Sequence, residues 1–315
     1  MRQQVGNPQL LRTMNERLLL DHLRVHGPTS RGELAKATGL SKPTVSAALV
    51  GLENAKLVKL VGSVGGRPGP TTAIYDMNVY AGWVAGIDIG ADWIRVAIAD
   101  LRGDFTARRD VRNTARSAAE LVRRVRKLAE DAAAEAGIQW AEVTYAVIGS
   151  PGVLNAATGR LDFADNLPGW GRPGLVDKLR AALEVDFAIE NDINLAALGE
   201  LAFGAGQGRF DFVMVSVGTG VGMGIVINGG LYVGAKGAAG EVSFLPAAES
   251  DVPDAVTRQR GMTETVTAAG GIARAARQAG LSLGSVKEIF AAAAAGDQRA
   301  RSEEHTSELQ SRTLI

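Results

Sequence analysis

Short apolar stretches alternate with helical segments from residue 82 to residue 228, and several of these stretches end in glycine or acidic residues. The pattern predicts strands at 82–90, 93–101, 144–149, 187–192, 212–217 and 224–228, and helices at 117–137 and 193–204. A short turn separates the first two strands, which therefore form a hairpin. Alternating strands and helices, with polar groups at strand ends, predict an α/β fold for this part of the chain.

Residues 9–54 follow a different pattern, in which three helical segments succeed one another. Gly27-Pro28 ends the first segment, and Thr29 or Ser30 caps a short second helix at 31–38. The turn Gly39-Leu40-Ser41 leads into a third helix that carries a proline in its first turn, where a missing N–H costs nothing. Two helices joined by a tight glycine turn predict a helix-turn-helix. Apolar faces at helical spacing comprise Leu10, Leu11, Met14, Leu18, Leu19, His22 and Leu23 in the first helix, and Val45, Ala48, Leu49 and Leu52 in the third.

In a helix-turn-helix, the first residues of the second helix reach base edges and phosphates in the major groove. The residues at these positions are Ser41, Lys42, Thr44 and Ser46. A lysine suits a phosphate or a guanine, and hydroxyl groups suit phosphates. We therefore expect these four residues to contact double-stranded DNA.

An alternating strand at 56–61, a tip rich in glycine and proline at 62–70 and a second strand at 72–75 predict a wing. Arg67 in the tip suits insertion into a narrow minor groove. Residues 1–75 hold ten Lys and Arg against four Asp and Glu, a net charge of +6, and the remainder has a net charge of −6. A basic head on an acidic body indicates that the head meets a polyanion. Because helix-turn-helix patterns alone are often false matches, the prediction rests on the caps, the wing and the charge together.

The composition excludes several kinds of site. The chain has no cysteine, which removes disulfides, thiolate catalysis and every cysteine-based zinc site. Its histidines are His22, His26 and His305, so a Ser-His-Asp triad or a histidine-rich metal site in the α/β part is excluded as well. The sequence shows no membrane-length apolar run and no signal peptide, which predicts a cytoplasmic protein without a membrane partner.

The glycine-rich stretch 217–222 leaves two interpretations open. It is not a P-loop, because no Gly-Lys-Ser/Thr follows, and Met223 stands where a dinucleotide fingerprint needs its last glycine. The stretch fits a simple hairpin turn, and its backbone N–H groups fit a cradle for phosphate equally well.

The order of these motifs closely resembles that of the ROK family, which comprises repressors, open reading frames and sugar kinases. The resemblance covers residues 9 to about 295 and rests on Asp88-x-Gly90, Ser150-Pro-Gly-Val, Asn166-Leu-Pro-Gly-Trp170, Glu190-Asn-Asp-x-Asn194-x-Ala-Ala-Leu-Gly-Glu200, Val217-Gly-Thr-Gly-Val-Gly222 and Gly237-Ala-Ala-Gly-Glu241. It implies a winged helix-turn-helix followed by an actin-like (RNase H-like), two-lobed domain of the sugar-kinase type. A winged helix ahead of such a domain is typical of the family's regulators, which respond to sugars or sugar derivatives.

The sequence departs from the family's kinases at three places. Asp92 puts a carboxylate in the first phosphate turn, where it would repel ATP. Phe244 replaces the histidine that binds sugar and zinc, and the zinc loop is reduced to Arg258-Gln-Arg-Gly261 without cysteine. We therefore expect no zinc, no ATP cofactor and no enzyme activity. The remaining phosphate-turn residues are vestigial: Asp88, Gly90, Gly218, Thr219 and Gly220.

The resemblance also implies which residues bind a sugar ligand: Asn166, Asn191, Asp192, Glu241 and Glu264. Asp192 lies where the kinases have their general base, and a carboxylate there accepts a sugar hydroxyl proton. The simpler alternative is that Asp192 caps the helix that follows it. Both roles are compatible at the edge of a cleft.

Three regions are expected: a winged helix-turn-helix at 1–76, a ROK domain at 77–300 and a tail at 301–315. The tail breaks the preceding alanine- and glycine-rich pattern, and residues 301–311 resemble an in-frame translation of a sequencing-library adapter. A non-native tail would leave the ROK domain incomplete at its C-terminus. The alternative is an ordinary polar C-terminal helix.

These features together predict a sugar-sensing transcriptional regulator, a repressor of carbohydrate metabolism, that binds an operator as a homodimer or homotetramer. Two other functions stay open. One is a sugar kinase with an appended DNA-binding head, in which Asp192 is catalytic. The other is a regulator whose body is only a dimerisation scaffold.

Overall fold

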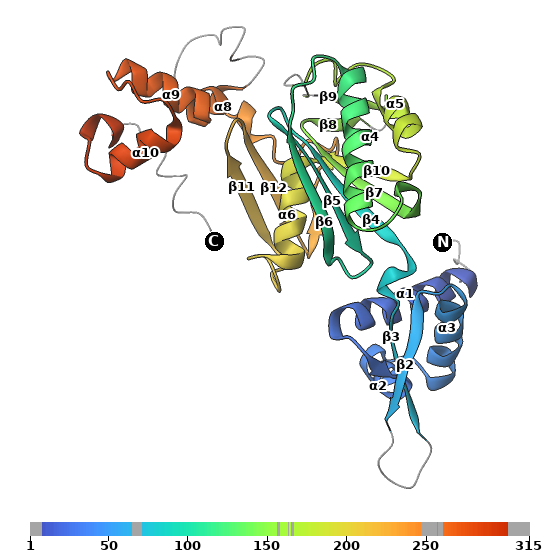
Figure 1. Ribbon diagram of the computed structural model, residues 1–315. Helices are drawn as coiled ribbons and strands as arrows, with labels where there is room; N and C mark the ends of the chain where they lie inside the picture. The colour runs from blue at the N-terminus through green and yellow to red at the C-terminus, as the bar shows by residue number, and fades with distance from the viewer. Residues whose placement is uncertain are drawn as a thin grey trace, which may run out of the picture.

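The computed structural model describes residues 8–64, 71–155, 158–162, 164, 167–246, 257 and 261–301. Its elements form a small N-terminal head and a larger two-lobed body, joined by a short connecting segment (Figure 1). Two predicted site residues, Arg67 and Asn166, lie outside the described residues. So do 258–260 of the former zinc loop and almost all of the tail predicted at 301–315.

The head has the predicted winged helix-turn-helix architecture. Its helices are α1 (Pro8–His26), α2 (Arg31–Thr38) and α3 (Lys42–Asn54), and its strands are β1 (Thr29–Ser30), β2 (Val58–Val64) and β3 (Thr72–Met77). The strands form an antiparallel sheet in the order β1-β3-β2, and β2 and β3 extend beyond the helices as the wing (Figure 1). The core between helices and sheet includes Leu19, Leu23, Leu34, Val45, Leu49, Leu52 and Tyr75.

The head covers only part of the apolar surface that the sequence predicts for helix α1. Leu19 and Leu23 are fully buried against the rest of the head. The four apolar residues on its outer side, by contrast, are all exposed: Leu10, Leu11, Met14 and Leu18. The helix therefore carries two apolar faces, and the head covers only one of them.

The first lobe of the body is built on a five-stranded sheet in the order β10-β7-β4-β5-β6. An antiparallel meander of β4 (Trp83–Ile89), β5 (Trp93–Asp100) and β6 (Phe105–Arg112) continues through β7 (Val143–Ser150) and β10 (Phe187–Asn191), which are parallel to β4. Helices α4 (Ala118–Glu135) and α5 (Leu175–Leu183) lie along one face (Figure 1). This order is the one expected of an RNase H-like lobe, with β4, β5, β7 and β10 close to their predicted bounds.

Strand β4 shows how the sheet separates core from site. Its alternate side chains Ala85, Ile87 and Ile89 are buried in the core under α4, together with residues of β5, β7 and α4. Gly86 and Asp88 point to the opposite face, which α4 does not cover. Period-two alternation thus places an apolar layer on one side of the sheet and a polar group of the predicted phosphate turn on the other.

The second lobe contains a smaller antiparallel sheet, β11 (Phe212–Val217), β12 (Val221–Ile227) and β13 (Gly230–Leu231). A 3-10 helix (Val242–Phe244) and helices α8 (Met262–Thr267), α9 (Ala269–Gln278) and α10 (Val286–Ala294) follow. Between the lobes runs α6 (Asp192–Phe203). A two-stranded ribbon, β8 (Val153–Asn155) and β9 (Arg160–Asp162), completes the body. None of the described helices has the length and apolar composition of a membrane span.

Helix α6 lies unusually close to β12 because that strand has glycine where the helix crosses it. A Cβ atom at Gly224 would lie 2.5 Å from the Ala197 Cβ and 2.9 Å from the Ile193 carbonyl oxygen. A Cβ at Gly222 would lie 2.9 Å from the Ile193 side chain. These glycines therefore set the distance between α6 and the second lobe.

Replacing Gly224 with alanine should destabilise the body by about 1–3 kcal/mol, because the added methyl group has to push the helix away. The matched control is Gly199→Ala, which adds the same methyl group to the open side of α6, with no atom within 4 Å. The control should stabilise the chain by about 0.5–1 kcal/mol, the usual gain for alanine over glycine inside a helix. Thermal unfolding of both variants tests this prediction, and equal shifts would contradict the packing argument.

Candidate functional site

The turn of the helix-turn-helix is held by caps on both of its helices. Ser30 caps α2 and forms a capping box with Glu33, whose carboxylate accepts from the Ser30 backbone N–H at 3.0 Å. The Ser30 hydroxyl donates to the same carboxylate oxygen at 2.6 Å, and this bond, with the one from the backbone N–H, holds the pKa of Glu33 below its ordinary value. Gly39 ends α2 in the left-handed conformation, with φ of 72°, and Ser41 caps α3. The caps fix where the two helices end and start, and so the angle at which α3 is presented.

The four predicted DNA contacts on α3 differ in how available they are. Ser41 and Lys42 are exposed, whereas Thr44 and Ser46 are half-buried. The Ser41 and Thr44 hydroxyl groups are hydrogen-bonded to each other at 2.8 Å, and Ser41 also accepts from the Thr44 backbone N–H. Lys42 is therefore the side chain at the start of α3 that is best placed to reach a phosphate.

Sequence reasoning overlooked one basic residue of the head, Arg31. Its guanidinium donates to the Tyr75 hydroxyl and lies over the Tyr75 ring, 5.1 Å from the ring centre. This contact joins the first residue of α2 to strand β3 of the wing. The sequence signal that could have pointed to Arg31 is its position directly after the Ser30 cap.

In the body, the sequence Glu190-Asn191-Asp192 ends β10 and begins α6. Asn191, and not Asp192, is the N-cap: its Oδ1 accepts from the backbone N–H groups of Ile193 and Asn194. Its Nδ2 donates to the Gly152 carbonyl oxygen at 3.2 Å. The alternative that Asp192 is the cap is therefore wrong, although its Oδ1 also accepts from the Ile193 N–H at 2.9 Å.

Four predicted residues bring carboxylates together around the start of α6: Asp88, Asp192, Glu241 and Glu264. Burial raises the pKa of Asp192 above its ordinary value, and the negative charge of Asp88 raises it further. Burial likewise raises the pKa of Glu241, with added repulsion from Asp192 and Glu264. The negative charges therefore influence one another in sequence, Asp88 with Asp192, Asp192 with Glu241, and Glu241 with Glu264. Carboxylates accept hydrogen bonds, so these residues suit a ligand that donates several of them, such as a polyhydroxylated molecule.

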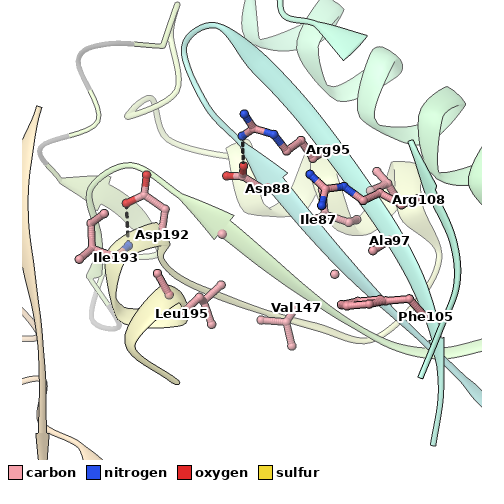
Figure 2. Close-up of a pocket in the computed structure, with 14 residues that line it drawn as sticks. Ile87, Asp88, Arg95, Ala97, Phe105, Arg108, Val147, Asp192, Ile193 and Leu195 are labelled. Atoms are coloured by element: carbon pink, nitrogen blue, oxygen red, sulfur yellow. Dashed lines mark hydrogen bonds and ion pairs between the residues drawn. The ribbon is translucent and has the colours of Figure 1, made fainter. Parts of the chain in front are cut away.

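A pocket of about 490 Å³ opens beside this cluster, between the uncovered face of the first sheet and α6. Asp88 of β4 and Asp192 of α6 both line it, together with apolar Val147 and Leu195 (Figure 2). Leu195 fits closely against the sheet, since a Cβ at Gly149 would lie 3.2 Å from its Cδ1 atom. Arg95 and Arg108 line it as well, so the pocket has an apolar floor and carries two carboxylates and two guanidinium groups.

Asp88 is partly neutralised by a neighbour that the sequence analysis missed. Arg95 is its partner across the β4–β5 hairpin and donates to Asp88 Oδ2 at 2.6 Å. Arg95 also lies 3.7 Å from Asp110 on β6, and Arg108 donates to both carboxylate oxygens of Asp110, from Nε and Nη2 (Figure 2 shows Asp88, Arg95 and Arg108). The predicted hairpin could have indicated this ion pair, because its short turn sets Asp88 opposite Arg95.

The two glycine turns are both three-residue hairpin connections. Gly90, Ala91 and Asp92 join β4 to β5, and the Asn113 amide donates to the Gly90 carbonyl oxygen at 2.8 Å. Gly218, Thr219 and Gly220 join β11 to β12, with the Gly218 N–H donating to the Gly220 carbonyl oxygen at 2.8 Å.

A carboxylate of the chain itself lies against the second turn. The Val221 N–H, directly after that turn, donates to Glu264 Oε2 at 3.3 Å. Glu264 thus occupies one of the backbone donors that a phosphate would use. The hairpin interpretation accounts for the observed turn.

Other residues of the family motifs hold the fold. The Trp170 indole N–H donates to the Ser150 hydroxyl at 2.7 Å, and both residues are buried. Glu190 accepts from the buried Asn194 amide at 2.9 Å. Phe244 is 41% exposed. Within the described part of the chain, no three His, Asp, Glu or Cys side chains are grouped as metal ligands would be.

Comparison with known proteins gives a consistent family assignment. Residues 84–310 match the ROK family model, and residues 12–67 match the MarR family model. The xylose repressor of Bacillus subtilis (strain 168) is 28% identical over 245 residues, which are 76% of this chain and 62% of the repressor. The chain therefore spans less than two thirds of the length of that relative.

Two solved structures resemble the fold. A ROK family transcriptional regulator, a homologue of the E. coli MLC protein, superimposes with a TM-score of 0.76 at 22% identity, covering 93% of this chain and 76% of that one. A ROK family glucokinase from Streptomyces griseus, in complex with glucose and AMPPNP, gives a TM-score of 0.57 at 29% identity, covering 71% and 75%. Since the family model spans most of the residues, the chain belongs to the ROK family.

Proposed function

We propose that the chain is a DNA-binding transcriptional regulator, a repressor of carbohydrate uptake or use, whose ROK body binds a sugar or sugar derivative. One observation carries the proposal: the same chain combines a winged helix-turn-helix, with an exposed Lys42 at the start of α3, and a body whose pocket is lined by Asp88 and Asp192. Similarity to a xylose repressor supports it. We take 1–76 as the DNA-binding domain and 77–300 as the sugar-binding domain.

We further propose that the body binds its sugar without phosphorylating it. Glu264 already accepts the Val221 N–H beside the second glycine turn, and Asp92 adds a negative charge to the first. Both carboxylates oppose the binding of a triphosphate. The candidate ligands for sugar hydroxyl groups that remain are Asp192 and Glu241, with Asn191, Asn166 and Glu264 as further candidates.

The sugar would regulate DNA binding by linkage. A ligand that binds one arrangement of lobes and heads more tightly than another shifts the chain toward that arrangement. The affinity for DNA then changes accordingly. The head meets the body at an ion pair between Asp76 of β3 and Arg102, at 2.9 Å. In a homodimer or homotetramer, two heads would read half-sites about one helical turn of DNA apart.

Fluorescence anisotropy of the chain on labelled DNA from upstream of its own gene tests the proposal, with and without a panel of sugars. Tight binding that weakens steeply with salt and is released by one sugar would establish a sugar-responsive repressor. Sequence-independent binding at every salt concentration, or none at all, would remove the DNA-binding function.

Lys42→Ala should weaken binding to every DNA sequence. It should also reduce the slope of log affinity against log salt concentration by about one, as expected for the loss of one phosphate contact. Lys127→Ala is the matched control, because Lys127 is an exposed lysine on α4 of the body. Arg67→Ala in the wing tip should lower affinity most for sites with a narrow minor groove. Titrations at several salt concentrations measure all three, and an unchanged slope for Lys42→Ala would contradict its role.

Asp192→Asn should weaken sugar binding and yet raise the melting temperature at pH 7. Loss of a charged hydrogen-bond partner costs about 1.5–3 kcal/mol of binding. The pKa of Asp192 is higher in the folded chain than in the unfolded chain. The stability that depends on the protonated carboxyl group is therefore fully present at acid pH. It is lost as the pH rises from the pKa of the unfolded chain to that of the folded chain. The asparagine variant therefore gains stability at neutral pH, and the gain should vanish below about pH 3.9, the ordinary pKa of aspartate.

Asp177→Asn on α5 is the control for that measurement, since the Asp177 side chain is 81% exposed. It should alter neither melting temperature nor sugar affinity. Scanning calorimetry across pH, with and without sugar, compares the two variants. A lower melting temperature for Asp192→Asn at pH 7 would refute the burial argument.

A sugar kinase with a DNA-binding head is the second candidate, favoured by the 29% identity to a glucokinase. ATP-dependent phosphorylation of a hexose, lost in Asp192→Asn, would support it. If no sugar raises the melting temperature, the body would serve only as a scaffold.

A further inference from the structure

The outer face of α1 has the spacing of a helix-pairing seam. Leu11, Leu18 and Val25 recur every seven residues, and Met14 lies between the first two. All four are exposed, at 54%, 43%, 63% and 59% in the order Leu11, Leu18, Val25 and Met14. Seven-residue spacing keeps a stripe on one side of a helix and is typical of helices that pair along their length.

This stripe is separate from the face that α1 uses in its own head. Leu19 and Leu23 are fully buried on the inner face. Arg12 and Glu16, which pair at 3.0 Å, lie against Gly51 of α3 on that same side. The outer stripe is therefore available to another molecule.

We infer that the outer face of α1 pairs with α1 of a second copy of this chain in antiparallel orientation. The seven-residue row of the stripe is symmetric about Leu18, with Leu11 seven residues before it and Val25 seven residues after it. A twofold axis at Leu18 brings the two Leu18 side chains together. It also places Leu11 of each copy against Val25 of the other.

Charge selects the antiparallel orientation. Asp21 lies on the stripe, at the position that continues the Met14 row by seven residues, and is 3.8 Å from Arg17. In a parallel pair the two Asp21 carboxylates would face each other in an apolar seam, which is unfavourable. In the antiparallel pair each Asp21 lies opposite Asn15 of the second copy, two residues from the Arg17 of that copy, whose positive charge attracts it.

Because the chain has no cysteine, single cysteines test the geometry directly. Leu18→Cys should form an intermolecular disulfide under mild oxidation, since a symmetry axis at residue 18 brings the two Cβ atoms to about 4 Å. Thr13→Cys is the control: Thr13 is also exposed on α1 but lies about 140° around the helix from Leu18. Equal cross-linking of the two variants, or none in either, would overturn the inference.

The orientation has its own test. Leu11→Cys and Val25→Cys should each cross-link poorly alone, because the like residues lie about 20 Å apart along antiparallel helices. An equimolar mixture should yield a disulfide-linked heterodimer that mass spectrometry identifies. Efficient cross-linking of Leu11→Cys with itself would show a parallel pair instead.

Light scattering of the full chain completes the test without oxidation. Leu18→Glu should halve the molar mass, whereas Leu18→Met should leave it unchanged, and circular dichroism checks that both fold. An unchanged mass for Leu18→Glu, together with absent Leu18→Cys cross-linking, would overturn the inference. The pairing does not depend on DNA binding: a cross-linked dimer that binds no operator removes the proposed function alone, and a monomer that binds DNA removes this inference alone.

Discussion

The close contact of α6 with β12 is the constraint on which the site depends. With Gly222 and Gly224 under it, the helix lies near enough to the second lobe for Ile193 to touch that strand, while Leu195 packs on Gly149 of the first lobe. One short helix therefore fixes both lobes at once. The residue at its start, Asp192, reaches the pocket because of this placement.

The positions that sequence reasoning located well are those where one strong local signal acts. Strands β4, β5 and β7 have apolar runs that are typical of buried strands. The capping residues Ser30, Gly39 and Ser41 mark where α2 begins and ends and where α3 begins. The motif order picked out Asp88 and Asp192, and both line one pocket in the structure. Such signals need no knowledge of distant contacts.

What could not be read from the sequence depends on partners far away in the chain or on competition between neighbours. Strand β6 was missed because only Ala107 of its residues is buried, so it has no apolar periodicity. Asn191 and Asp192 can both cap a helix, and backbone geometry decides between them. In α1, periodicity revealed apolar faces but not that the head would cover only one.

Strand β6 also bears on the solubility of the protein. It forms one outer edge of the five-stranded sheet, where unpaired backbone groups invite strands of other molecules to add. Its middle carries Arg108, Arg109 and Asp110, and Arg109 reaches across to Glu135 of α4 at 2.7 Å. Charges along an edge make it costly to dock a foreign strand there. The polarity that hides β6 from a hydrophobicity pattern thus also guards the sheet against aggregation.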